Sequence, residues 1–122
     1  MDFVFTCNAC GFKLTAIVSG NPVELDVADG HDLVPQGFTS KSEDWGGDEW
    51  VVNAADADAL KLTDDSKRLS GCCDLDGCDG PNLRCPSCSE YVATARFDCW
   101  MPKHIRMLQA ATTMQSIASK EK

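Results

Sequence analysis

The sequence predicts a mainly β fold of small antiparallel sheets with little helix. Three features support this prediction: short segments in which apolar and polar residues alternate, turn-forming residues between them, and two CxxC motifs far apart in the chain. A chain of 122 residues has the ordinary length of one domain. We therefore expect a single domain at 1–108 with a mobile loop near 31–49, followed by a C-terminal tail or short helix at 109–122.

The N-terminal half contains the first predicted strands. Residues 3–6 lead into the first CxxC, and residues 12–18 follow it with apolar side chains at alternate positions. Gly20 and Pro22 then break the chain, and residues 23–27 alternate again before the Asp-Gly turn at 29–30, a pattern that predicts a hairpin. A further strand is predicted at 49–54, after the loop rich in Gly, Ser, Asp and Pro.

The C-terminal half gives fewer clear elements. Residues 56–71 fit either a short helix or an irregular segment, because a loose helical pattern is interrupted by pairs of aspartates. Residues 91–97 alternate and predict a strand directly after the second CxxC. Residues 105–108 can close the sheet, and weak helical character follows. We therefore expect each CxxC to be followed by a strand.

Four of the eight cysteines have the spacing of a metal site. In a CxxC turn the gap of two residues lets both sulfurs face one ion, and two such turns supply the four ligands of a closed tetrahedral site. Zinc is the metal expected there, in a structural role, and it would join distant parts of the chain because residues 11–84 lie between the pairs. Thiol redox chemistry and inert buried thiols are the alternatives. The ligands of this first site are Cys7, Cys10, Cys85 and Cys88.

The remaining cysteines suggest a second zinc site. Neighbouring residues of an extended strand point to opposite faces, so Cys72 and Cys73 reach one ion only if the backbone turns sharply between them. Plain buried thiols are the alternative, because free cysteine is among the most buried residue types. We thus expect one zinc ion or two. The candidates for the second site are Cys72, Cys73, Cys78, Cys99 and His104.

The charge balance narrows the classes of partner. A formal charge of −8 argues against binding to nucleic acid or to anionic membranes, both of which attract positive surfaces, and it favours a basic protein. An acidic residue stands near the N-terminus where a secretory signal carries positive charge, and no apolar run is long enough to cross a bilayer. We therefore expect a cytoplasmic protein, in which thiols stay reduced.

The segments "CNACGFKLTAIV" and "CPSCSEYVATARF" resemble the two zinc knuckles of the β-tent group, which includes the Yippee and cereblon-type thalidomide-binding domains. A zinc ribbon or another rubredoxin-like arrangement also uses two CxxC knuckles. The resemblance implies that the first four cysteines bind one zinc that clamps two sheets. The other four cysteines, and the serine in place of a glycine after Cys88, depart from the group pattern.

The same resemblance implies a cage of aromatic side chains beside the zinc-bearing sheet. Trp45, Trp50 and Trp100 are the candidates for it, although tryptophan is commonly buried without any ligand. The leading hypothesis is therefore a small zinc-binding module that recognises a protein or a small ligand. The alternative is an acidic inhibitor or immunity-type protein that covers a basic surface of a toxin or nuclease. An enzyme, with Cys99 and His104 as nucleophile and base, is less favoured.

Overall fold

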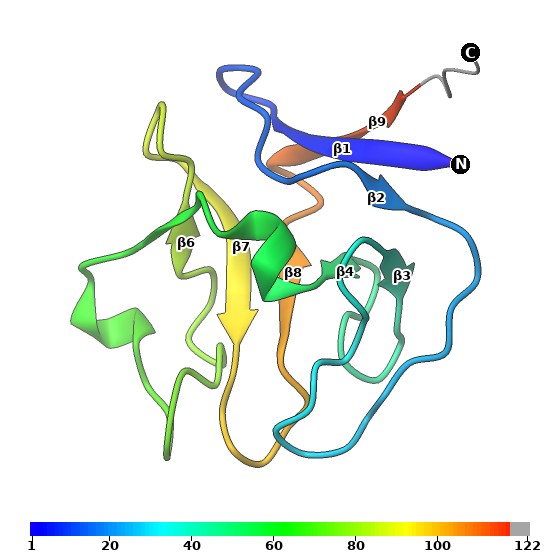
Figure 1. The fold of residues 1–122 in the computed structure, drawn as a ribbon. Helices are drawn as coiled ribbons and strands as arrows, with labels where there is room; N and C mark the ends of the chain where they lie inside the picture. The colour runs from blue at the N-terminus through cyan, green and yellow to red at the C-terminus, as the bar shows by residue number, and fades with distance from the viewer. Residues whose placement is uncertain (118–122) are drawn as a thin grey trace.

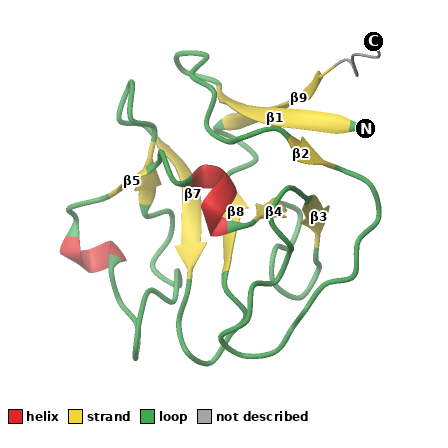
Figure 2. Cartoon of the chain, in the orientation of Figure 1, coloured by secondary structure: helices red, strands yellow, loops and turns green. Residues whose placement is uncertain are grey.

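The computed structural model describes residues 1–117, which form two antiparallel sheets (Figure 1). The smaller sheet has the strand order β2-β1-β9 and the larger one the order β3-β4-β8-β7-β6-β5. Two short 3-10 helices and long irregular connections complete the described chain (Figure 2). The prediction of a mainly β fold is confirmed. The elements are β1 (Asp2–Cys7), β2 (Val18–Ser19), β3 (Thr39–Lys41), β4 (Trp50–Val52), η1 (Ala54–Ala57), β5 (Lys61–Leu62), η2 (Ser66–Arg68), β6 (Leu83–Arg84), β7 (Tyr91–Arg96), β8 (His104–Met107) and β9 (Thr112–Ile117).

The smaller sheet joins two segments from opposite ends of the sequence. Strand β1 pairs with β9 along its whole length, from Asp2 opposite Ile117 to Cys7 opposite Thr112. The expectation of a tail or short helix at 109–122 is therefore wrong for residues 112–117. Weak helical propensity is overridden here because β9 gains a complete ladder of hydrogen bonds with a distant strand. Residues 118–122 lie outside the described part of the chain.

The segment 12–18 is not the strand that its alternation predicted. It pairs with β1 through a single bridge between Thr6 and Lys13, and only its last residue, Val18, belongs to β2. The backbone N–H of Leu14 donates to Phe5, whereas that of Ala16 donates to Asp56 in η1. This crossing segment, residues 12–18, thus leaves β1 to contact η1 and returns to β1 at Val18. Residues 23–27 are also irregular, so the predicted hairpin is absent from the described chain.

The larger sheet contains three of the predicted strands, β4, β7 and β8. Strand β7 lies between β8 and β6, and its four central residues, Val92 to Ala95, are all buried. The segment expected as a mobile loop contains β3, and its Leu33 and Val34 are buried with Val51 in a small apolar cluster.

None of the helices described in residues 1–117 has the length and apolar character that a membrane span requires.

The main core lies where the two sheets meet. In Figure 1 strands β1 and β9 run roughly crosswise to β7 and β8. Burial of apolar surface from both sheets in one cluster holds them together. The smaller sheet and its crossing segment contribute Phe5, Cys7, Leu14 and Val18, and the larger sheet contributes Val52, Leu83, Val92, Ala93, Ala95, Ile105 and Met107.

Candidate metal centre

The four cysteines of the two CxxC motifs meet at one edge of the core. Cys7 is the last residue of β1, and Cys10 follows in the turn after it. Cys85 comes directly after β6, and Cys88 lies in the turn that leads into β7. Each sheet therefore contributes one pair of thiols. Both turns begin at the end of a strand, as predicted for the first CxxC. The expectation of a strand directly after each CxxC is confirmed for the second by β7 and wrong for the first.

The sulfur positions fit a tetrahedral ion. The Sγ atoms of Cys7 and Cys88 are 3.6 Å apart, and so are those of Cys10 and Cys85, which places the close pairs between the motifs. All four sulfurs lie within 4.8 Å of one another. A zinc ion with Zn–S bonds of about 2.3 Å holds its sulfurs about 3.8 Å apart, close to this spacing. The cysteines are free thiols rather than disulfides. The predicted four-cysteine cluster is thus present and can hold a metal such as zinc.

The two turns repeat the same backbone geometry. The carbonyl of Cys7 accepts the N–H of Gly11 at 2.7 Å, and the carbonyl of Cys85 accepts the N–H of Ser89 at 2.9 Å. Gly11 has φ +81°, and Ser89 has φ 68°, the single positive φ of a non-glycine residue among residues 1–117. Ser89 therefore adopts the left-handed conformation that glycine adopts in the first knuckle, at a cost in strain.

Each knuckle also has one further backbone hydrogen bond, donated by the N–H of its first cysteine. The N–H of Cys7 donates to Phe12 at 2.9 Å, and that of Cys85 donates to Glu90 at 2.8 Å. In the second knuckle the N–H of Ser87 also donates to the Cys85 sulfur at 3.4 Å. Donors of this kind stabilise thiolates and orient them toward a shared ion.

The thiols differ in acidity because their surroundings differ. The backbone N–H of Phe12 lowers the pKa of Cys10 to about 7. At Cys88 the N–H of Glu90 lowers the pKa, but desolvation and the neighbouring thiols outweigh it and raise the pKa to about 12. Burial raises the pKa of Cys85. Four thiolates cannot share this space without a cation, so metal binding must release protons and weaken as the pH falls.

Three of the remaining cysteines form a second cluster. The sulfurs of Cys72, Cys73 and Cys99 lie within 4.8 Å of one another, and all three residues are exposed. The chain bends at residues 72–74, which supplies the sharp turn that two adjacent cysteines need to face one point. The thiols crowd one another: hydrogen bonding and charge at Cys73 raise the pKa of Cys72 and raise that of Cys99 to about 12.

A buried carboxylate underlies this second cluster. Asp98 is fully buried, and its Oδ1 accepts the backbone N–H groups of Cys73, Asp74 and Cys99 at 2.9, 3.3 and 2.7 Å. Its Oδ2 accepts the N–H of Cys72 at 2.7 Å and the indole N–H of Trp100 at 3.0 Å. Burial raises the pKa of Asp98, but these donors outweigh it and hold the pKa below the usual value of aspartate. Asp98 was not among the residues predicted from the sequence, because no motif marks it.

Two candidates for the second site lie outside the cluster. Cys78 is exposed in a turn, where its N–H donates to Asp76 Oδ1 at 2.8 Å. His104 is fully buried on β8, and its Nδ1 bonds to the carbonyl of Pro102 at 2.8 Å rather than to Cys99. Desolvation lowers the pKa of His104 to about 4. Neither residue joins the three sulfurs, because each is held by its own local backbone.

The three tryptophans occupy different surroundings. Trp45 packs on the small apolar cluster around Val51, with its ring 6.0 Å from that of His104. Trp50 packs on the main core, with the Lys41 ammonium 5.5 Å from its ring centroid. Trp100 is 47% exposed and bonds to Asp98. Burial against the core accounts for the first two rings, so these contacts do not build the predicted shared cage.

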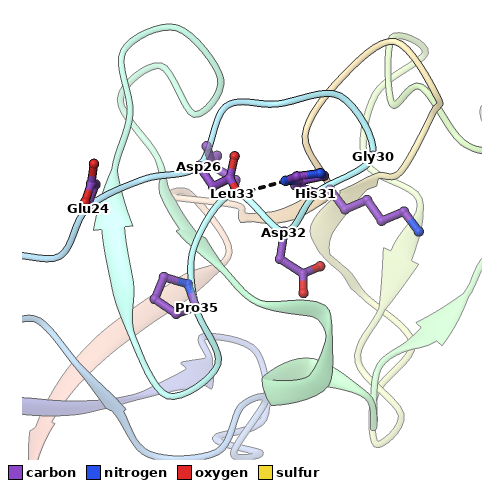
Figure 3. Close-up of a pocket in the computed structure, with 8 residues that line it drawn as sticks. Glu24, Asp26, Gly30, His31, Asp32, Leu33 and Pro35 are labelled. Atoms are coloured by element: carbon purple, nitrogen blue, oxygen red, sulfur yellow. Dashed lines mark hydrogen bonds and ion pairs between the residues drawn. The ribbon is translucent and has the colours of Figure 1, made fainter.

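Two surface hollows lie near charged or cysteine-bearing segments. One, of about 580 Å³, is lined by Glu24, Asp26, His31, Asp32 and Lys103, among others. Figure 3 shows Asp26 and His31 joined by their 2.9 Å contact, with Glu24 set apart from this pair. The other hollow, of about 280 Å³, lies against the first knuckle at Cys7 and Asn8.

No protein-family model matches the chain, and neither a curated protein nor a solved structure is significantly similar to it.

Proposed function

We propose that this protein is a small binding module whose two sheets are stapled by one structural zinc ion at Cys7, Cys10, Cys85 and Cys88. The observation that carries the proposal is the origin of the ligands: two sulfurs come from the smaller sheet and two from the larger, and two sulfur pairs 3.6 Å apart join one knuckle to the other. This is also the arrangement that the β-tent resemblance implies.

The chemistry of the donor set supports zinc in a structural role. Four thiolates leave no position open for a substrate, and zinc needs no redox partner. The ion contributes to folding directly, since it binds the native cluster far better than an unfolded chain with scattered thiols. The role left to the protein surface is recognition of a protein or a small ligand.

Elemental analysis with a matched pair of variants tests the staple. Cys10 is exposed, so Cys10→Ser removes a ligand with little loss of core packing, and Cys78→Ser replaces an exposed thiol outside both clusters. After dialysis against a moderate chelator, we expect the wild type and Cys78→Ser to retain one zinc per chain and Cys10→Ser to lose it and unfold at lower temperature. Full retention of zinc by Cys10→Ser would overturn the proposal.

A basic protein is the partner class that the surface favours, as in the inhibitor or immunity-type alternative. The chain carries a formal charge of −8, and the carboxylates of Glu24, Asp26 and Asp32 line the hollow of Figure 3. Such a surface speeds and steers encounter with a positive one, and salt screens the attraction. Binding of an arginine-rich test peptide should weaken steeply with salt and weaken further in Glu24→Gln/Asp32→Asn; salt-independent binding would argue for a small-ligand module.

A further inference from the structure

The two cysteine clusters differ in how far solvent reaches the sulfurs. In the four-cysteine cluster Cys7 and Cys85 are buried, Cys88 is partly covered and Cys10 is exposed. In the other cluster Cys72, Cys73 and Cys99 are all exposed. The first cluster is a closed set of four ligands, whereas the second presents three sulfurs at the surface. A metal at the second cluster would keep one side open to solvent.

The exposed cluster depends on Asp98. Its carboxylate accepts hydrogen bonds from the backbone N–H groups of residues 72–74 and of Cys99. These bonds bend the chain at 72–74 and hold it against the segment that contains Cys99. Adjacent side chains in an extended strand would point to opposite faces. The bend instead brings the sulfurs of Cys72 and Cys73 to the same point as that of Cys99.

The bonding of Asp98 also calls for an explanation. A buried carboxylate is costly unless its oxygens are satisfied. Every donor to Asp98 lies in the two segments that carry the three cysteines: four backbone N–H groups and the indole of Trp100. These hydrogen bonds therefore hold the two cysteine-bearing segments in position, and none of them comes from a positively charged side chain.

We propose that Cys72, Cys73 and Cys99 form a second metal site, an open three-thiolate site for zinc or another thiophilic divalent ion, with Asp98 as its positioning residue. Zinc with three protein ligands completes its coordination with water or an exchangeable ligand. Cys78 and His104 do not fill that position, since each is held elsewhere. The protein then carries two kinds of metal site, one between the sheets that retains its ion and one at the surface that exchanges it.

Competition with a chromophoric chelator separates the two sites in the full-length chain. The protein is reduced under anaerobic conditions, loaded with excess Zn²⁺, freed of unbound metal and then mixed with the chelator. We expect two equivalents per chain, one removed quickly and one retained. Cys99→Ser should lose the fast equivalent and keep the retained one, whereas Cys10→Ser should lose the retained one; the two proposals therefore fail independently.

Further variants test the geometry of the site. Cys78→Ser is the matched control, an exposed cysteine close in sequence, and it should keep both equivalents. Asp98→Asn should weaken the fast site roughly 10- to 100-fold, the usual effect of losing a partner that orients ligands, without changing the retained equivalent. A wild type that binds only one equivalent in excess Zn²⁺, or a Cys99→Ser variant that still binds two, would overturn the proposal. Alkylation of Cys73 and Cys99 in the metal-free protein only after a reductant is added would also overturn it, because it would show a disulfide there.

Discussion

Ser89 offers a direct test of the knuckle geometry. Its φ of 68° lies in the left-handed region, and the equivalent position of the first knuckle is Gly11. Both residues donate their N–H to the first cysteine of their motif, so the turn requires this conformation in each case. Within the described residues the Ser89 side chain makes no hydrogen bond that would offset the energetic cost of this conformation. Ser89→Gly should therefore stabilise the protein.

The size of the effect follows from two opposing terms. A non-glycine residue in the left-handed conformation costs roughly 1–2 kcal/mol. Glycine loses more backbone freedom on folding, which removes about 0.5–1 kcal/mol of that gain. The net stabilisation is about 0.5–1 kcal/mol, or about 2–5 °C in the melting temperature of a domain of this size. Gly11→Ser should lose a similar amount through strain alone, because a Cβ at Gly11 meets no atom within 4 Å.

The assay is thermal and urea unfolding of the two single variants and of the double variant Ser89→Gly/Gly11→Ser. Saturating Zn²⁺ keeps the metal contribution equal in all samples. We expect the double variant to melt near the wild type, because the two changes nearly cancel. If Ser89→Gly melted below the wild type, or if Gly11→Ser were neutral, the assignment of equal left-handed turns to the two knuckles would be refuted.

Three other substitutions test separate features. Asn82, fully buried, accepts the N–H of Ala95 and donates to its carbonyl, so Asn82→Ala should lower the free energy of unfolding by about 2–4 kcal/mol in a urea titration, and a neutral result would contradict the bonding described. Because the pKa of His104 is about 4 in the folded protein, the free energy of unfolding should fall by up to about 3 kcal/mol as the pH drops from about 6.5 toward 4. The plot of unfolding free energy against pH for His104→Gln should lack this loss. Trp100 lies beside Cys99, so binding of metal at the second site should change the tryptophan emission of the wild type. Trp100→Phe should still bind the metal but show no change in emission. An emission change as large as that of the wild type in Trp100→Phe would show that the signal comes from another tryptophan.

The sequence predicted the parts of the molecule that depend on local patterns. The CxxC spacing identified the four-cysteine cluster, because two residues between cysteines are enough to turn both sulfurs toward one ion. Alternation identified β7, because that strand carries its burial pattern in its own residues, whereas the same pattern at 12–18 and 23–27 failed. The strands predicted at 3–6, 49–54 and 105–108 correspond to β1, β4 and β8.

The missed parts depend on distant partners. Strand β9 exists because β1 is available beside it, and the crossing segment 12–18 leaves β1 because η1 accepts its next hydrogen bond. Cys72 and Cys73 face one point because their backbone bends around Asp98, whereas an extended backbone would turn them to opposite faces. The sequence does not reveal this bend. No local pattern could reveal Asp98, whose donors come partly from residues about 25 positions earlier.

The pairing of β1 with β9 also bears on the order in which this protein folds. Thr6 and its partner Thr113 are 107 positions apart, so during synthesis β1 leaves the ribosome long before the strand that completes its sheet. In that interval the crossing segment and β2 can cover one edge of β1, whereas the edge that β9 will occupy stays open, and an open edge invites pairing with other chains. Contacts between such distant residues also slow folding. A nascent chain of this protein should therefore depend on chaperones until β9 has emerged.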